Sequence, residues 1–260
     1  MRPWQSNSRS LFKRGHPRRR RVTEPNCGIV KVIIPALNEE ETIVRVIEDI
    51  PRERVSEIIV VDNGCSDRTA DRAAAAGARV VREPWPGYGS ACLRGLAAAA
   101  GADVVVFLDG DYSDYPEEMG LLLDTLCQGF DMVVGSRLAG ARAPGALPPH
   151  SVFGNWLVST LINRQTGARY TDLGPFRAVR YEKLMNLGMA DPDYGWTVEM
   201  ALRAAHAGWR VAEVPVRYRK RAAGRSKITG SFTASIKTAI KMFRVLLRLR
   251  RTLRAERCGL

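Results

Sequence analysis

The feature that most constrains the fold is a series of short, continuous apolar runs that alternate with segments of helical character. The runs are rich in Val and Ile, which is typical of strands buried on both faces of a sheet. Alternation at this spacing predicts right-handed crossovers and an α/β fold with a mostly parallel sheet flanked by helices. We expect strands at residues 30–35, 58–61, 79–81, 104–108, 132–135 and 209–216.

Acidic residues follow two of these expected strands. Asp62 follows the second, while Asp109 and Asp111 follow the fourth and are separated by Gly110. Open α/β sheets bind ligands outside the carboxyl ends of their strands, so we expect these acids at one site. Paired carboxylates suit Mg²⁺ or Mn²⁺ bridging to phosphates. Gly110 is expected to bend the chain and admit a ligand. Alone, the Asp-x-Asp pattern also fits a solvated turn.

The net charge of +13 is concentrated at the two ends of the chain. Residues 1–21 carry +8 and residues 228–260 carry +7, which leaves residues 22–227 close to neutral. Basic ends favour an anionic membrane surface or nucleic acid as a partner. They lack interleaved aromatic residues and a DNA-reading module, so nucleic-acid binding is disfavoured.

Residues 1–26 have almost no apolar periodicity and are predicted to form a disordered basic arm. They contain no apolar core of a secretory signal, and no stretch of the chain has the length of a spanning helix. The five cysteines are scattered and form no Cys-x-x-Cys pair. We therefore expect no disulfide framework, no zinc site and a reducing compartment.

Residues 228–260 are predicted to form an amphipathic helix and a tail. Apolar residues repeat at helical spacing beside a stripe of Lys and Arg between residues 231 and 251. Such a helix suits the plane of a membrane interface, which predicts a peripheral protein on the cytoplasmic face of a membrane. Packing on the catalytic domain, or pairing with a second copy in a homo-oligomer, are the alternatives.

Two other nucleotide-binding classes are disfavoured. The glycine-rich loop at residues 85–91 does not follow the first expected strand, and no acid follows it at the spacing of a dinucleotide fold. The chain also has no Gly-Lys-Ser/Thr phosphate loop. A nucleotidyltransferase would need a glycine-rich signature near the first strand, which is missing.

Several short motifs, taken together and in their order along the chain, resemble those of the family 2 glycosyltransferases. The resemblance is closest to the branch of dolichyl-phosphate mannosyltransferases and glucosyltransferases. They lie at residues 33–39, 60–67, 108–111, 135–137, 172–177 and 225–227. The resemblance implies a glycosyltransferase A-type fold and a catalytic domain over residues 27–227. The family's common second Asp is Asn63 here, and a frequent Gln is Ser113. These departures leave the sugar and the nucleotide open.

The resemblance implies a UDP- or GDP-hexose donor held with Mg²⁺ or Mn²⁺. The residues it assigns to the donor are Pro35, Ala36, Asn38, Glu39, Asp62, Gly89, Asp109, Gly110 and Arg137, with Asp109 and Asp111 as metal ligands. The residues it assigns to acceptor or other phosphates are Arg177, Arg225, Ser226 and Lys227. Arg offers phosphate a fork of donors and Lys a compact charge.

The implied reaction is inverting transfer of a hexose to a polyprenyl phosphate. The residues expected to take part in catalysis are Asp111, Asp172, Arg177 and Glu199. An ionised lipid phosphate requires no general base. A soluble hydroxyl acceptor is the alternative, and a carboxylate would then take its proton, with Glu199 the first candidate and Asp172 the second. Capping of a helix is the simpler explanation of Glu199.

Overall fold

The computed structural model describes residues 27–222. Within that part of the chain, no helix is both long and apolar enough to cross a bilayer. The predictions for the basic arm at 1–26, for Arg225, Ser226 and Lys227, and for the amphipathic helix at 228–260 lie outside the described residues.

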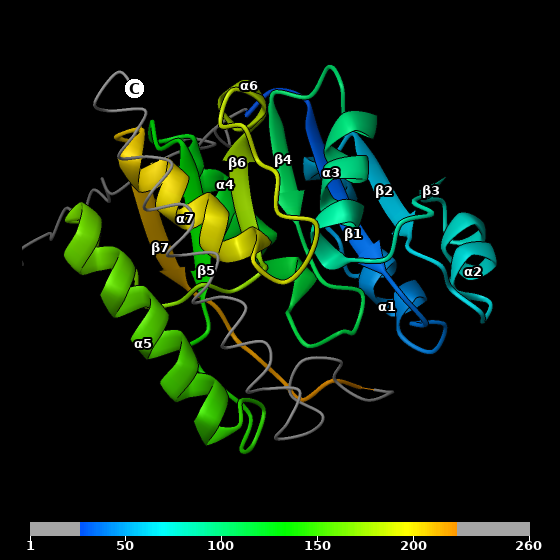
Figure 1. Ribbon diagram of the computed structural model, residues 1–260. Coiled ribbons are helices and arrows are strands. Elements are labelled where there is room, and N and C mark those ends of the chain that lie inside the picture. Colours follow the sequence, from blue (N-terminus) through cyan, green and yellow to red (C-terminus); the bar gives the residue numbers. More distant parts are fainter. Residues whose placement is uncertain (1–26, 223–260) are drawn as a thin grey trace, which may run out of the picture.

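A seven-stranded sheet forms the centre of the fold, with the strands in the order β3-β2-β1-β4-β6-β5-β7 (Figure 1). The strands are β1 (Val30–Ala36), β2 (Glu57–Asp62), β3 (Arg79–Arg82), β4 (Val104–Phe107), β5 (Met132–Ser136), β6 (Arg177–Arg180) and β7 (Val211–Pro215). The first four are parallel, β6 is antiparallel to β4 and β5, and β7 is parallel to β5. The mostly parallel sheet is therefore confirmed. Strand β6 was not expected from the sequence. It has four residues, and Arg177 and Arg180 at its ends leave no continuous apolar run.

Helices cover both faces of the sheet. They are α1 (Ile43–Glu48), α2 (Thr69–Ala75), α3 (Tyr88–Ala98), α4 (Met119–Leu126), α5 (Pro149–Thr166), α6 (Tyr181–Met185) and α7 (Trp196–His206). Side chains of α3, α5, α6 and α7 join one buried cluster, and those of α1, α2 and α4 join the other. Two short 3₁₀ helices lie at Arg52–Arg54 and Pro116–Glu118.

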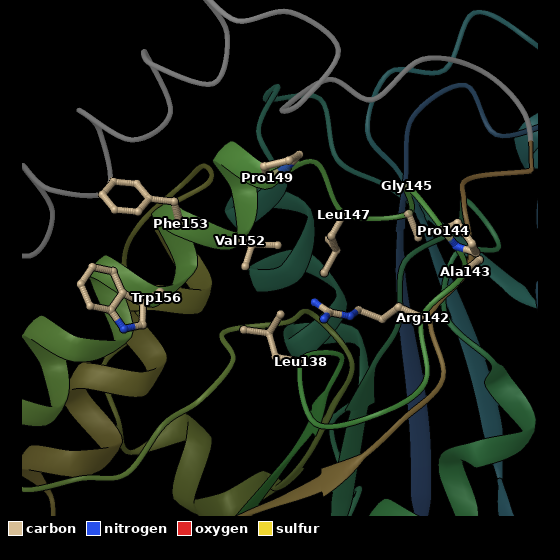
Figure 2. Close-up of a pocket in the computed structure, with 11 residues that line it drawn as sticks. Leu138, Arg142, Ala143, Pro144, Gly145, Leu147, Pro149, Val152, Phe153 and Trp156 are labelled. Atoms are coloured by element: carbon tan, nitrogen blue, oxygen red, sulfur yellow. The ribbon is translucent and has the colours of Figure 1, made fainter.

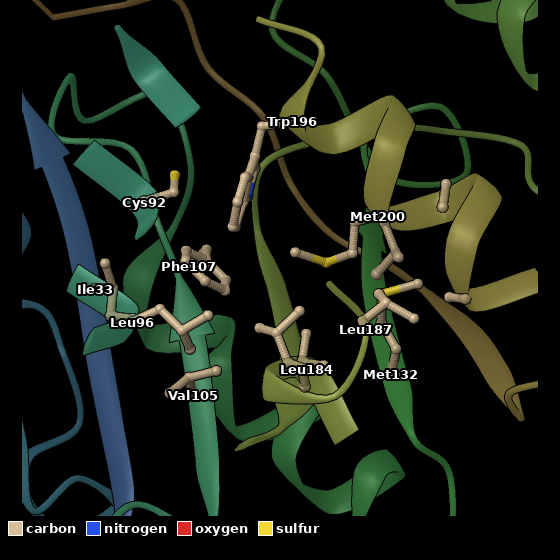
Figure 3. Packing of buried hydrophobic residues seen from close by; sticks show 14 of the residues in the cluster. Ile33, Cys92, Leu96, Val105, Phe107, Met132, Leu184, Leu187, Trp196 and Met200 are labelled. Atoms are coloured by element: carbon tan, nitrogen blue, oxygen red, sulfur yellow. The ribbon is translucent and has the colours of Figure 1, made fainter. Parts of the chain in front are cut away.

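Alternating side chains of the central strands supply both clusters. Ile33 of β1 faces the first cluster, while Val32 and Ile34 face the second. In the first cluster the ring of Phe107 meets that of Trp196 edge to face, with 5.9 Å between their centres (Figure 3). Burial on both faces explains why these strands are continuously apolar in the sequence.

The strand register brings the expected acids to one edge of the sheet. Strand β1 lies between β2 and β4, with Ala36 opposite Asp62 and Ile33 opposite Phe107. All three strands run in the same direction, so Asp62, the last residue of β2, and the segment that begins at Asp109 both lie at carboxyl ends at that edge.

The expectation about the cysteines was wrong in one respect. Cys27, just before β1, and Cys127, just after α4, form a disulfide with their Cα atoms 5.8 Å apart. Cys65 and Cys92 are free thiols. A separation of 100 residues leaves no local pattern by which the pair could be recognised in the sequence.

Candidate active site

The loop after β4 folds around the carboxylate of Asp111. Its Oδ1 accepts hydrogen bonds from the main-chain N of Ser113 at 2.9 Å and from the Ser113 hydroxyl at 2.5 Å. Tyr112 between them has a positive φ of 60°, and its hydroxyl donates to Asp49 of the loop after α1 at 2.5 Å. The unusual backbone conformation expected at Gly110 is therefore found two residues later.

Gly110 has ordinary surroundings. A Cβ added there would make only van der Waals contacts, the nearest at 3.5 Å to Glu39. Its carbonyl accepts a hydrogen bond from the Thr42 hydroxyl at 2.7 Å, which ties the acidic loop to the segment before α1.

Asp109 has an unusual electrostatic environment. Burial, followed by repulsion from the nearby Asp111 carboxylate, raises the pKa of Asp109 to about 7. The Tyr88 hydroxyl at the start of α3 donates to Asp109 at 3.1 Å and partly offsets this shift. A cation bound between the Asp109 and Asp111 carboxylates would relieve the repulsion that contributes to this shift.

A basic segment after β7 lies against this acidic loop. The main-chain N of Arg219 donates to the carbonyl of Ser113 at 2.9 Å, and its guanidinium stacks on Tyr112 and Tyr115 with 3.4 and 4.1 Å to the ring centres. Two residues on, Arg221 forms ion pairs with Glu39 at 2.8 Å and with Asp111 at 3.0 Å. The segment that leads to Arg225, Ser226 and Lys227 is thus joined to the acidic loop as far as residue 222.

The loops after β1 and β2 are tied together. Asn38 has a positive φ of 55°, and its Oδ1 accepts from the main-chain N of Ser66 at 2.8 Å. Asp62 accepts from the main-chain N of Cys65 at 2.8 Å, which closes the turn after β2. The main-chain N of Glu39 donates to the Thr69 hydroxyl at 2.8 Å. The loops that carry Asn38, Glu39 and Asp62, which were expected at the nucleotide, are therefore hydrogen-bonded to one another.

The substitution of the family's usual Asp by Asn63 has a local explanation. Its Nδ2 donates to the carbonyl of Trp85 at 2.8 Å, and its Oδ1 accepts from the N of Gly87 at 2.9 Å. An ionised Asp at this position could accept but could not donate. Asn63 therefore holds the glycine-rich loop.

Gly89, expected at the donor, packs closely against another loop. A Cβ at this position would lie 2.0 Å from the carbonyl O of Asp191, and one at Gly87 would lie 2.2 Å from that of Pro192. The next residue, Ser90, donates its main-chain N to Pro192 at 2.8 Å. Close packing of two backbones, rather than space for a ligand, accounts for glycine here.

Arg137, at the end of β5, is paired with Asp172. Its Nε lies 2.8 Å from Oδ2 and its Nη2 lies 2.7 Å from Oδ1, and its guanidinium carbon lies 5.2 Å from the ring centre of Tyr218. Burial alone would raise the pKa of Asp172, but Arg137 outweighs burial and lowers it. A carboxylate with a lowered pKa is a poor proton acceptor, so this geometry argues against Asp172 as a base.

The phosphate role expected for Arg177 needs correction. Its side chain is 1% exposed, and the guanidinium donates to the carbonyls of Leu173, Gly174 and Thr197. Burial lowers the pKa of Arg177. With its donors directed at main-chain carbonyls inside the fold, Arg177 organises the segment before β6 and does not face a phosphate.

Glu199 is also a structural residue in this arrangement. It is 1% exposed, and its Oε2 accepts from the main-chain N of Ala190 at 3.1 Å and of Asp191 at 2.6 Å. Its Oε1 pairs with Arg203, one turn later in α7, at 2.9 Å. These contacts agree better with a structural role, such as capping, than with a catalytic one. Glu199 binds the loop before α7, however, and does not cap the N-terminus of the helix.

Three residues of the site were not on the expected list. Tyr88 contacts Asp109, and Arg221 contacts Asp111. Asp114 is 2% exposed, and neither of its carboxylate oxygens has a hydrogen-bond partner in the described part of the chain. A signal in the sequence could have indicated Arg221. Every second residue from Arg217 to Arg221 is Arg, which predicts an extended segment with these side chains on one side.

The acidic loop is compatible with a divalent cation that brings other ligands with it. Asp109 and Asp111 supply two carboxylates, whereas nowhere between residues 27 and 222 do three or more His, Cys, Asp or Glu side chains group as a metal cage. Mg²⁺ is commonly held by one or two carboxylates, with waters and substrate phosphates as the remaining ligands. Two carboxylates are therefore enough when waters or a phosphate fill the remaining positions around the cation.

The sheet, its helices and the acidic loop after β4 define a glycosyltransferase A-type fold. The family model described as glycosyl transferase family 2 matches residues 31–188. This chain belongs to that family, and it is a nucleotide-sugar-dependent glycosyltransferase.

Known proteins similar to this chain share most of its length. An uncharacterized glycosyltransferase of Mycobacterium tuberculosis is 38% identical over 84% of this chain and 97% of its own. The dolichyl-phosphate hexose transferase of Haloferax volcanii is 32% identical over 80% of this chain and 90% of its own. The crystal structure of glucosyl-3-phosphoglycerate synthase from M. tuberculosis, in complex with Mn²⁺, UDP and phosphoglyceric acid, superposes with a TM-score of 0.68. It is 27% identical and covers 85% of this chain and 78% of its own.

Proposed function

We propose that this protein is an inverting glycosyltransferase that moves a hexose from a nucleoside diphosphate sugar to a polyprenyl phosphate. The observation that carries the proposal is the loop of Asp109 and Asp111 at the sheet edge that also bears Asp62. Similarity to a dolichyl-phosphate hexose transferase over most of both chains supports the acceptor class.

The donor would lie across the carboxyl ends of β1, β2 and β4. The connected loops of Asn38 and Asp62 would hold the nucleoside, and Asp109 and Asp111 would hold Mg²⁺ or Mn²⁺ against the diphosphate. The cation, when bound, supplies positive charge that stabilises the departing diphosphate. The solved neighbour with Mn²⁺ and UDP supports this assignment.

The bond changes of the transfer require no proton acceptor. An oxygen of the ionised acceptor phosphate forms a bond to the anomeric carbon, while the bond from that carbon to the diphosphate breaks and its electron pair leaves with the nucleoside diphosphate. Both candidate bases are already engaged, Asp172 by Arg137 and Glu199 by Arg203 and two main-chain N–H groups. This favours an acceptor that arrives deprotonated over a hydroxyl.

An apolar hollow beside the site suits the tail of such an acceptor. It has a volume of about 690 Å³ and is lined by Leu138, by residues 142–147, and by Pro149, Val152, Phe153 and Trp156 of α5 (Figure 2). Phe153 is 61% exposed and Trp156 is 55% exposed. Arg142 is the charged residue of the lining, and its backbone pairs with Tyr218, which also pairs with Asp114. Tyr218 therefore links the segment that lines the hollow to the acidic loop.

A soluble phosphorylated acceptor is the second candidate. The neighbour with a TM-score of 0.68 is a glucosyl-3-phosphoglycerate synthase in complex with phosphoglyceric acid. That acceptor has no apolar tail, so this candidate leaves the hollow of residues 138–156 without a role.

The test compares acceptors under otherwise equal conditions. Purified full-length protein with Mn²⁺ is supplied with UDP- and GDP-hexoses and with either a short-chain polyprenyl phosphate or 3-phosphoglycerate. We expect sugar transfer to the prenyl phosphate. Transfer to 3-phosphoglycerate alone would overturn the proposed acceptor, and no transfer or hydrolysis of any donor would overturn the donor assignment.

The variant Asp111→Asn tests the site itself. We expect a loss of at least about a hundredfold in transfer, because an essential charge at the diphosphate is removed. Asp71→Asn on the exposed surface of α2 is the matched control and should retain activity. Circular dichroism checks that both variants fold. Full activity of Asp111→Asn would contradict the role of this acid.

A further inference from the structure

The side chain of Arg221 already occupies a cationic position at the acidic loop. Its Nη1 lies 2.8 and 3.0 Å from the two carboxylate oxygens of Glu39, and its Nη2 lies 3.0 Å from Oδ2 of Asp111. These residues are separated by 182 and 110 positions in the chain. Only the folded structure brings one guanidinium between the loops after β1 and β4.

This contact competes with the cation of the proposed function. Oδ1 of Asp111 accepts two hydrogen bonds from Ser113, and Oδ2 is paired with Arg221. A metal that binds Asp111 through Oδ2 must displace the guanidinium, because both are positive and use the same oxygen. The contact of Nη1 with both carboxylate oxygens of Glu39 would still hold Arg221 at the site.

We propose that Arg221 is a donor-binding residue that neutralises Asp111 until a divalent cation replaces it, and that the released guanidinium then contacts the donor diphosphate. This inference rests on the proposed function, since it takes Asp111 as a metal ligand. Arg is suited to both contacts, because its planar fork pairs with carboxylate and with phosphate. Arg219, stacked on two tyrosines, anchors the segment so that a small movement of Arg221 suffices.

The exchange couples metal and nucleotide. Without nucleotide, the metal binds against the cost of breaking the contact between Arg221 and Asp111. With a diphosphate present, the displaced guanidinium gains a new anionic partner and that cost falls. Binding of either ligand therefore strengthens the binding of the other, and the coupling is reciprocal.

The experiment measures Mn²⁺ binding by electron paramagnetic resonance on the full-length protein, without nucleotide and with saturating UDP or GDP. In Arg221→Gln we expect Mn²⁺ alone to bind about fivefold more tightly than in the wild type, because the competing charge is gone. At saturating Mn²⁺ we expect nucleotide to bind about tenfold more weakly, because a charge-assisted contact is lost.

Two further variants separate charge from position. Lys220→Gln removes the same charge from the exposed neighbouring residue and should leave both affinities at the wild-type values. Arg221→Lys keeps a cation near Asp111, so Mn²⁺ binding without nucleotide should stay close to wild type while nucleotide binding weakens. Equal Mn²⁺ affinity in Arg221→Gln and wild type, with both proteins binding Mn²⁺ and nucleotide, would overturn the exchange alone. Absence of Mn²⁺ binding to the wild type even with nucleotide would overturn the proposed function as well.

Discussion

Asp114 shows how the site concentrates negative charge that the fold does not compensate. Its carboxyl group is buried without a hydrogen-bond partner in the described chain. Burial first, and then the carboxylate of Asp109, raise its pKa well above the ordinary value of 3.8. A buried acid without a partner is costly when it is ionised, so this residue reduces the stability of the folded protein at neutral pH.

The variant Asp114→Asn should therefore stabilise the protein in a pH-dependent way. An acid whose pKa is raised by folding binds more protons in the folded state, so stability falls as the pH rises above the unfolded value of about 3.8. We expect Asp114→Asn to melt at a higher temperature than the wild type at pH 8 and at the same temperature near pH 3.5. Thermal unfolding followed across this range is the measurement. A lower melting temperature of the variant at pH 8 would contradict the assignment.

Other residues show the limit of assignment by motif. The resemblance implies that Arg177 binds phosphate, and Glu199 was the first candidate base for a hydroxyl acceptor, but both are buried and bonded within the protein. A motif gives the type of residue and its position in the chain. The direction in which the side chain points depends on the segments packed around it, here those of residues 172–174 and 190–191.

At the scale of elements, the entry into α3 depends on close packing of two backbones. The N-terminus of α3 touches the segment at residues 191–193, and glycines at positions 87 and 89 make that approach possible. Tyr88 lies between them and bonds to Asp109. The main-chain contacts of Gly87 and Gly89 thus position the Tyr88 side chain at Asp109.

Gly89→Ala tests this contact against a matched substitution. The added Cβ at position 89 would lie 2.0 Å from the carbonyl O of Asp191, whereas Gly154, also within a helix, has nothing within 4 Å of its Cβ position. We expect Gly89→Ala to lower the melting temperature by an amount that corresponds to about 1–3 kcal/mol. We expect Gly154→Ala to be neutral or to stabilise by up to about 1 kcal/mol. Equal effects of the two substitutions would show that the packing at Gly89 is unimportant.

At the scale of the whole molecule, the disulfide between Cys27 and Cys127 joins the start of β1 to the end of α4. It closes a loop with a sequence separation of 100 residues that includes the first four strands of the sheet. A cross-link of this length removes much of the conformational freedom of the unfolded chain.

The disulfide should raise the free energy of unfolding by about 5 kcal/mol, as the chain-entropy estimate for a loop of this length gives. Chemical denaturation with and without reductant measures the difference, and the double variant Cys27→Ser and Cys127→Ser should show no effect of reductant. Denatured, unreduced wild type should expose three titratable thiols of the five cysteines in the chain. Five thiols, with equal stability in reductant, would exclude the cross-link.

The sequence by itself determined the mostly parallel sheet, the edge at which Asp62 and Asp109 gather, and the family. The sheet and its polar edge follow from local periodicity, because a strand covered on both faces is apolar throughout. The family follows from the resemblance of short motifs to those of known glycosyltransferases. Only the tertiary structure decided that β6 enters antiparallel, that Arg177 turns inward, that Cys27 meets Cys127, and that Arg221 reaches Asp111. Those contacts join residues far apart in the chain, so they depend on how whole elements pack, which no local pattern records.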